Sequence, residues 1–229
     1  MGIKRMMGEV VVEVIKTATK RMKYIEYLCD KRDELIDNYI RSLQNDDIDG
    51  ARKFIRAIQA MNRVIEPEIM SVIAAGRMLA RYMNDENHIQ IFRMVFGDNA
   101  AVDEKTLLAL AKNIADDDIK GCMREIIGKI ENEKEIEPDD KMILIKAVTA
   151  YELYHRIEEV MERLEVGVER LKTAFLNFLE ARGIDKKNMD LEPKAMEVGT
   201  VEEENIDWRV DLKKYIEKRL NPDVDKAYN

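Results

Sequence analysis

One apolar stripe constrains the fold of this chain more than any other feature. Between residues 143 and 178 apolar side chains recur at steps of three and four, without a polar residue in the stripe over five heptads. Such spacing places them on one face of a single helix. Pro138 suits the first turn and Gly183 the left-handed cap, so the pattern predicts a helix over residues 138–182. The stripe consists of Ile143, Ala147, Ala150, Tyr154, Ile157, Met161, Leu164, Val168, Leu171, Phe175 and Phe178.

A second stripe near the N-terminus has the same spacing. It runs from Val11 to Leu43, is broken only by Arg32, and predicts a long helix over residues 9–44. Aromatic residues make up only 6% of the chain, and 4 prolines and 10 glycines are too few for the frequent turns of sandwiches and barrels. The predicted fold class is therefore all-α, an elongated multi-helix bundle with long heptad-patterned helices of the coiled-coil type.

The chain also matches itself at an offset of about 71 residues, without a gap. Residues 46–50, with the sequence DDIDG, match residues 117–121, with the sequence DDIKG. Residues 65–68 (IEPE) match residues 136–139 (IEPD) in the same register. We interpret the match as an internal duplication, with chance identity as the alternative.

The duplication predicts that residues 1–183 form one duplicated bundle, with copies at about 30–97 and 101–168. Each copy is expected to contain a helix, an acidic turn, a middle helix, a proline-marked turn and a third helix. Aspartates of the acidic turn would cap the middle helix by accepting hydrogen bonds from its free amides. In the first copy Pro67 would end that helix, since the residue before a proline is pushed out of helical geometry.

The C-terminal residues differ in composition from the rest of the chain. Residues 184–207 are rich in Asp and Glu and contain Pro193 and Gly199, which predicts an acidic linker. Residues 208–220 follow as a short amphipathic helix, which is marginal alone in water and must dock on this chain, a second copy or a partner. The face that we expect to make this contact carries Trp208, Leu212, Tyr215, Ile216 and Leu220.

The charge of the chain limits the kinds of binding partner that we expect, and its cysteine content indicates the cellular compartment. The net charge of -8 disfavours general nucleic-acid binding, which needs clustered Lys and Arg. Residues 1–23 alone hold six basic and two acidic residues, 6 - 2 = +4, so an anionic partner such as a membrane surface stays open at that end. Cys29 and Cys122 are the only cysteines, and no leader or membrane-spanning run is recognised, so we expect reduced thiols in the cytoplasm.

The two histidines offer a metal-binding alternative. His88 follows Asp85 by three residues and His155 follows Glu152 by three, so each pair shares a helix face. Bundles of the ferritin-like kind hold two irons with such pairs and an added Glu from another helix. Glu125 could supply it for the second pair, but residues 51–65 contain no acid for the first. A structural role for the histidines is favoured, and no metal or other cofactor is predicted.

Two family resemblances remain beside these patterns. Arg81 and His88, separated by six residues, resemble the ribonuclease motif of the HEPN family, although Tyr82 stands where a polar residue usually follows the Arg. That resemblance implies a dimer in which Arg81 stabilises phosphate charge and His88 handles a proton. The duplicated helical architecture is similar to the PhoU family of phosphate regulators, but no metal-binding signature of that family is recognised here, so it implies no site residues.

No motif of a common enzyme class occurs in the chain: it has no nucleophile elbow, glycine-rich phosphate loop or paired-cysteine metal motif. Catalysis is therefore disfavoured, and no small-molecule substrate is indicated. The function that we expect is a non-catalytic scaffold, adaptor or self-assembling protein that binds a protein partner or a second copy. The unbroken stripe over residues 143–178 could pack against a twin, but packing against the N-terminal helix is favoured.

Overall fold

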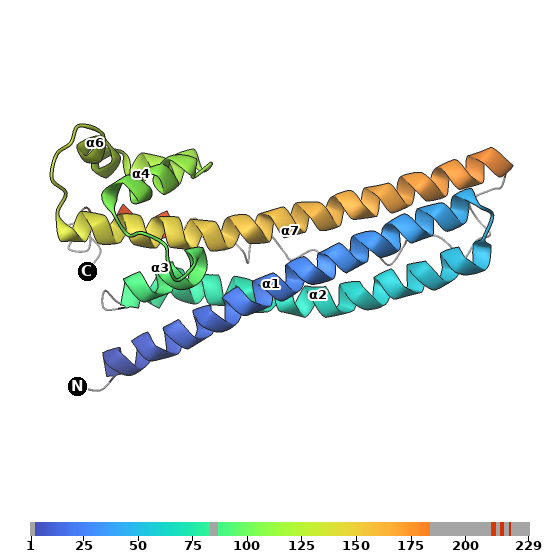
Figure 1. The fold of residues 1–229 in the computed structure, drawn as a ribbon, viewed down its shortest axis with the longest axis horizontal. Helices are drawn as coiled ribbons and strands as arrows, with labels where there is room; N and C mark the ends of the chain where they lie inside the picture. The colour runs from blue at the N-terminus through green and yellow to red at the C-terminus, as the bar shows by residue number, and fades with distance from the viewer. Residues whose placement is uncertain (1–2, 83–86, 184–211, 214–215, 218–219, 221–229) are drawn as a thin grey trace, which may run out of the picture. The chain divides into compact units, whose positions relative to one another are not determined.

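The computed structural model describes residues 3–82, 87–183, 212–213, 216–217 and 220 (Figure 1). All regular secondary structure in this part of the chain is helical. The predicted all-α fold class is therefore confirmed. The helices are α1 (Ile3–Gln44), α2 (Ile48–Tyr82), α3 (His88–Phe96), α4 (Glu104–Asn113), α5 (Asp117–Cys122), α6 (Arg124–Glu131) and α7 (Pro138–Arg182).

The chain divides into two compact units. Unit 1 comprises Met1–Lys20, Val72–His155 and Glu204–Asn229, and unit 2 comprises Arg21–Ser71 and Arg156–Glu203. The long helices α1, α2 and α7 each contribute a segment to both units. The boundaries predicted from the sequence, at 1–183, 184–207 and 208–220, stay a prediction.

Unit 2 is built from three long helical segments that lie side by side (Figure 1). Ion pairs join α1 to α7 in rising order along both helices, from Arg156 with Glu26 to Arg170 with Asp37, so these two segments are parallel. Contacts of α1 with α2 fall in the opposite order, so α2 is antiparallel to both. The buried core contains Ile36, Tyr39 and Leu43 of α1, Ala51, Ile55 and Ile58 of α2, and Val168, Leu171, Phe175, Phe178 and Leu179 of α7.

The apolar stripe of α7 lies inside the protein, as its burial shows. Apart from Met161, which is half-buried, every residue of the predicted stripe is buried. In unit 2 the stripe packs against α1 and α2 of the same chain, which is the intramolecular arrangement that the sequence favours. Contact between this stripe and a second copy is therefore not available in unit 2.

The acidic turn between α1 and α2 is a helix cap. Asp47 accepts a hydrogen bond from the backbone N–H of Gly50 at 2.9 Å, which satisfies one of the free amides of α2. Gly50 is needed because a Cβ at that position would lie 2.0 Å from Asp47 Oδ2. The matching glycine, Gly121, has nothing within 4 Å of such a Cβ, and α5 is capped by Asp116, which is not the counterpart of Asp47 at the 71-residue offset.

The predicted helix end at Pro67 is wrong, because α2 continues through this proline to Tyr82. Pro67 is exposed, so the carbonyl that loses its hydrogen bond can be hydrated. Its neighbours Ile65 and Ile69 are buried, and their packing holds the helix on both sides of the proline. The corresponding Pro138 instead starts α7 after a loop, so the two copies do not fold alike. The internal duplication itself stays a prediction.

Unit 1 combines the four short helices with segments of the long ones. The hydroxyl of Tyr151 on α7 accepts a hydrogen bond from the backbone N–H of Ala115 at 2.9 Å, just before α5. Lys129 of α6 pairs with Asp140 of α7 at 2.9 Å. Asp103 caps α4 by accepting from the backbone N–H of Thr106. The first two contacts join the start of α5 and α6 to the N-terminal third of α7.

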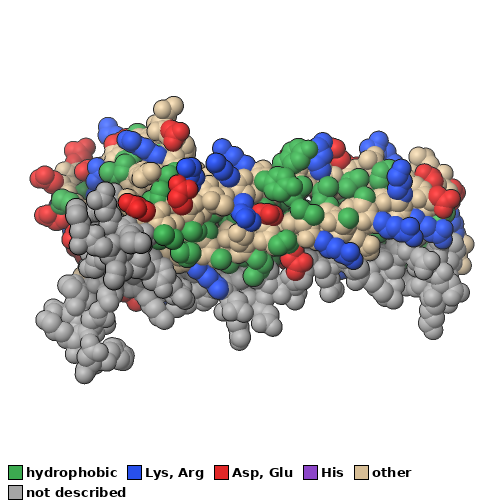
Figure 2. Space-filling model, turned by 90° about the horizontal axis from the view of Figure 1, so that it is seen from below, with side chains coloured by type: hydrophobic (Ala, Val, Ile, Leu, Met, Phe, Trp, Pro, Cys, Tyr) green, Lys and Arg blue, Asp and Glu red, His purple; other side chains and the backbone are tan. Residues whose placement is uncertain are grey.

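The surface carries scattered apolar side chains among charged ones. Figure 2 shows hydrophobic groups exposed next to Lys and Arg on one face of the molecule. In unit 2, Tyr24 and Tyr27 of α1 are about half exposed, and the ammonium of Lys31 lies 6.0 Å from the centroid of the Tyr27 ring. Among the helices that the structure describes, none combines the length and apolarity needed to cross a membrane.

Candidate functional site

A ladder of arginines on α7 fixes the α1–α7 contact in unit 2. Arg156, Arg163 and Arg170 recur every seven residues, and each pairs with carboxylates of α1. The strongest rung is Arg163, which donates to Asp30 and to Asp33, each at 2.7 Å. The seven-residue spacing of the three arginines is visible in the sequence and would indicate such a ladder, but the ladder is not among the predicted features.

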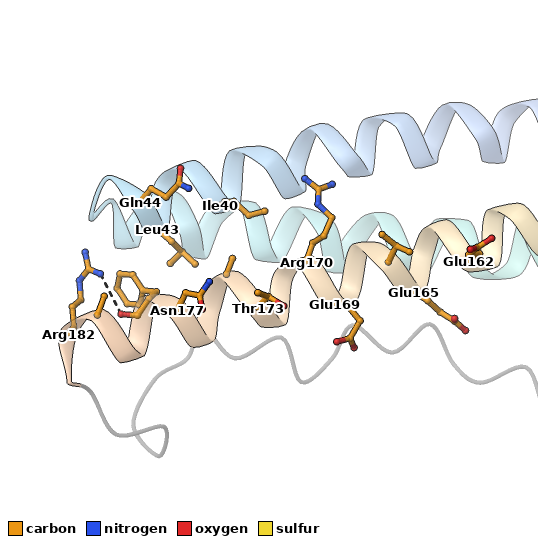
Figure 3. Close-up of a pocket in the computed structure, with 14 residues that line it drawn as sticks. Ile40, Leu43, Gln44, Glu162, Glu165, Glu169, Arg170, Thr173, Asn177 and Arg182 are labelled. Carbon is orange, nitrogen blue, oxygen red and sulfur yellow. Dashed lines mark hydrogen bonds between the residues drawn. The ribbon is translucent and has the colours of Figure 1, made fainter.

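Beside this ladder, α1 and α7 of unit 2 form an open groove of about 940 Å³ (Figure 3). It follows α7 from Glu162 to Arg182, roughly 30 Å at 1.5 Å per residue. The residues that line it are Ile40, Leu43 and Gln44 of α1, and Glu162, Glu165, Val166, Glu169, Arg170, Thr173, Ala174, Asn177, Phe178, Ala181 and Arg182 of α7.

The charge of the side chains that line the groove changes along its length. Figure 3 shows Glu162, Glu165 and Glu169 following one another at one end and Arg182 at the other, with Thr173 and Asn177 between them. Apolar groups line the groove as well, including Val166, of which 53% is exposed. A surface that combines apolar contact area with charged ends suits another helix more than a small molecule.

Arg182 is held at the basic end by three contacts. Its guanidinium lies 4.0 Å from the centroid of the Phe178 ring, it donates to the Phe178 carbonyl at 3.5 Å, and it pairs with Asp46 of the α1–α2 turn. Arg170 in the middle is paired with Asp37. At the opposite end, by contrast, neither Glu162 nor Glu165 has a hydrogen-bond or ion-pair partner among the described residues. The groove therefore offers a fixed cation at one end and unpaired carboxylates at the other.

The stripe of α1 is interrupted by Arg32, and the structure buries this side chain completely. Its Nε donates to Asn62 Oδ1 of α2 at 2.8 Å, and its Nη2 donates to the carbonyl of Leu164 on α7 at 3.2 Å. Burial lowers the pKa of the Arg32 guanidinium from its ordinary value. Arg32 thus binds all three helices of unit 2 together at the level where an apolar residue would be expected.

The proposed metal ligands do not come together in the described part of the chain, where no group of three or more His, Cys, Asp or Glu side chains has a metal-binding arrangement. Glu125 is exposed and pairs with Lys129 at 3.5 Å. The ring of His155 stacks on Tyr151, with centroids 5.7 Å apart, and Glu152 is half-buried. Asp85 lies outside the described residues.

The HEPN-like pair is separated by the α2–α3 connection. Arg81 belongs to the last turn of α2, and its side chain lies outside the described part. His88 is the first residue of α3, and its side chain is completely buried. A buried imidazole cannot reach an RNA phosphate without rearrangement, so the structure offers no support for a role of His88 in RNA cleavage.

The C-terminal amphipathic residues are only partly described. Leu212 and Ile216 are helical and buried by the chain itself, and Leu220 is half-buried. Lys213 lies 3.9 Å from Asp118 of α5, within unit 1. Docking on this chain, one of the three alternatives that the sequence left open, therefore accounts for the burial of Leu212 and Ile216. Binding of a partner by this segment stays a prediction. Trp208 and Tyr215 lie outside the described residues, as does the predicted linker up to residue 207.

Both cysteines are free thiols. Burial raises the pKa of Cys29 to about 11, and the nearby Arg163 and Arg32 offset only part of this effect. Burial is also the main reason why the pKa of Cys122, on α5, is raised. A thiol with a raised pKa is a poor nucleophile at neutral pH, so neither cysteine has the environment of a catalytic residue.

The groove is therefore a feature of the described part of unit 2 that is open to a ligand, with carboxylates at one end and Arg182 at the other. Its lining contains carboxylates, arginines and apolar groups but no nucleophile placed beside a histidine. Comparisons with protein-family models, with curated proteins and with solved structures give no match to this chain.

Proposed function

We propose that the protein is a non-catalytic helical scaffold or adaptor, and that it binds helical segments of proteins in the groove between α1 and α7 of unit 2. The observation that carries this proposal is the groove itself, which pairs exposed apolar area with a cation at one end and unpaired carboxylates at the other. Amphipathic helices are recognised in this way, by apolar anchors spaced along an open groove.

The dimensions of the groove support a helical occupant. Its length of roughly 30 Å corresponds to about 20 residues of helix, or five to six turns. A helix laid there would cover the exposed Val166 and the half-buried Ile40 and Ala174. A basic group at one end of that helix would find Glu162 and Glu165, which have no partner in the described part of the chain. The favoured partner is thus an amphipathic helix with a basic end.

The scaffold beneath the groove is rigid enough to present it. The arginine ladder and the buried Arg32 link α1, α2 and α7 at several levels. A pre-ordered surface loses little conformational entropy on binding, which favours affinity. We also propose a cytoplasmic location, because neither Cys29 nor Cys122 is in a disulfide and reducing compartments keep thiols free.

Site-specific photo-crosslinking in cells tests the proposal. A photoreactive phenylalanine is placed at Thr173, which lines the groove, and in a matched variant at Glu180, which is exposed on α7 but lies outside it. We expect protein adducts from position 173 and few from position 180. Mass spectrometry should identify a crosslinked peptide whose sequence has the apolar spacing of an amphipathic helix. Equal adduct yields at the two positions, or none at either, would overturn the proposal.

A further inference from the structure

We infer that the occupant of the groove is α7 of a second copy of this chain, laid antiparallel across it. This inference rests on the proposed function and names the partner of the same surface. It concerns the groove face of α7, which shares only Phe178 with the apolar stripe that is already buried against α1 and α2 in unit 2. Among the described residues that packing leaves the groove face uncovered, so a second copy can bind there.

The order of charges along the groove is the first argument. Glu162 and Glu165, which have no partner in the part of the chain that the structure describes, lie at one end, and Arg182 lies at the other. A helix that complements this order must carry its cation opposite the glutamates and its carboxylates opposite Arg182. α7 itself has that order when it runs in the opposite direction. Two copies then place Arg182 of each next to Glu162 and Glu165 of the other.

The registers of the apolar groups agree with the same arrangement. The midpoint of the groove along α7, between Glu162 and Arg182, falls at residue 172. A twofold axis at this level pairs position 162 with 182, and it also pairs position 166 with 178. Val166, which is 53% exposed, therefore lies opposite the position of Phe178, which borders the groove with 5% of its surface exposed beneath the Arg182 guanidinium. The same twofold axis thus pairs charged positions with oppositely charged ones and apolar positions with apolar ones.

Symmetry is the third argument. A contact between identical surfaces about a twofold axis is isologous. Each pairing therefore occurs twice, and no interacting surface is left over to bind further copies. A parallel arrangement would place Glu162 and Glu165 beside the same residues of the second copy, and like charges across an interface are unfavourable. The antiparallel arrangement is therefore the one that the groove selects.

Charge exchange between two variants of the full chain tests the inference by sedimentation velocity. Variant A carries Glu162→Arg and Glu165→Arg, and variant B carries Arg182→Glu. Each variant alone places like charges at both ends of the contact, so we expect the dimer dissociation constant of each to rise about a hundredfold. A mixture of A and B restores opposite charges at both ends, so a dimer of A with B is expected.

Several outcomes would overturn the inference: a monomeric wild-type chain, dimers of A or B as tight as the wild type, or an A and B mixture that stays monomeric. Circular dichroism checks that each variant keeps its helix content.

A second variant tests the same contact without changing its charges. Thr173→Cys, made together with Cys122→Ser, introduces a thiol one residue from the proposed twofold axis. This thiol should form a disulfide with the same thiol of the second copy. A monomeric chain whose position 173 crosslinks to another protein would sink this inference and leave the proposed function intact.

Discussion

Gly167 of α7 lies directly against the buried guanidinium of Arg32 in unit 2. A Cβ at position 167 would be 2.4 Å from Nη1 of Arg32 and 3.0 Å from Cδ1 of Ile36. Glycine is otherwise unfavourable within a helix by about 1 kcal/mol relative to alanine. Its presence in the middle of α7 is explained by the space that the Arg32 side chain occupies.

Gly167→Ala is therefore expected to destabilise the protein despite the better helix propensity of alanine. Overpacking costs about 1–3 kcal/mol, and Arg32 cannot move aside without losing its hydrogen bonds to Asn62 and Leu164. Once the gain of about 1 kcal/mol in helix propensity is subtracted, we expect a net loss of up to about 2 kcal/mol in the free energy of unfolding, measured by urea denaturation. Gly128→Ala in α6 is the matched control, since nothing lies within 4 Å of its Cβ, and it should be neutral or slightly stabilising.

Arg32 and Asn62 should be strongly coupled in a double-mutant cycle. Asn62→Leu removes the acceptor of Nε and leaves a buried charge with less compensation, at a cost of about 3 kcal/mol. Arg32→Met leaves the buried Asn62 side chain without its donor, at a cost of about 1–3 kcal/mol. The loss of unfolding free energy in the double variant should be smaller than the sum of the losses in the two single variants, by at least about 1 kcal/mol. Additive losses in urea denaturation would show that the hydrogen bond contributes little.

The arginine ladder should make unit 2 sensitive to salt at its central rung. Arg163→Ala removes the guanidinium that donates hydrogen bonds to Asp30 and Asp33. The free energy of unfolding should fall by about 1 kcal/mol at low ionic strength. The difference from the wild type should shrink as sodium chloride is added, because the pairs are partly exposed. Lys172→Ala, which breaks a more exposed pair with Glu169 on the same helix, should cost less than about 0.5 kcal/mol.

Cys29 predicts a specific loss of stability at alkaline pH. Burial raises the pKa of its thiol from 9.0 to about 11, so the folded state holds the proton more tightly than the unfolded state. The resulting stabilisation is complete below pH 9 and disappears as the pH rises from about 9 to 11. The wild type should lose about 2 kcal/mol more than Cys29→Ala over this window in urea denaturation. Parallel pH profiles for the two proteins would contradict the prediction.

The sequence predicts the long helices well because their apolar stripes are local and repetitive. α7 spans the residues that its stripe, Pro138 and Gly183 indicate. α1 begins six residues before the predicted start at residue 9 and ends at the predicted Gln44. At Pro67, by contrast, the local rule for a helix end is overridden by the packing of Ile65 and Ile69, which a sequence pattern does not reveal.

The groove and the Arg32 contact are harder to predict for a different reason. Arg32 reads as a break in the stripe, since its acceptors come from α2 and α7, 30 and 132 residues away. The groove depends on which face of α7 is left open once α1 and α2 have packed on the others. The candidate sites in the sequence centre on the histidines, because imidazole is a chemically distinctive side chain. The structure instead places the open surface beside a ladder of ordinary arginines.

The most direct test that partners bind in the groove compares substitutions at two apolar positions of α7. Val166 lines the groove, whereas Leu176, of which 42% is exposed, does not. With the photoreactive residue at Thr173, Val166→Glu should abolish the protein adducts, and Leu176→Glu should leave their yield unchanged. Adducts that survive Val166→Glu, or that are lost equally in both variants, would contradict binding in the groove.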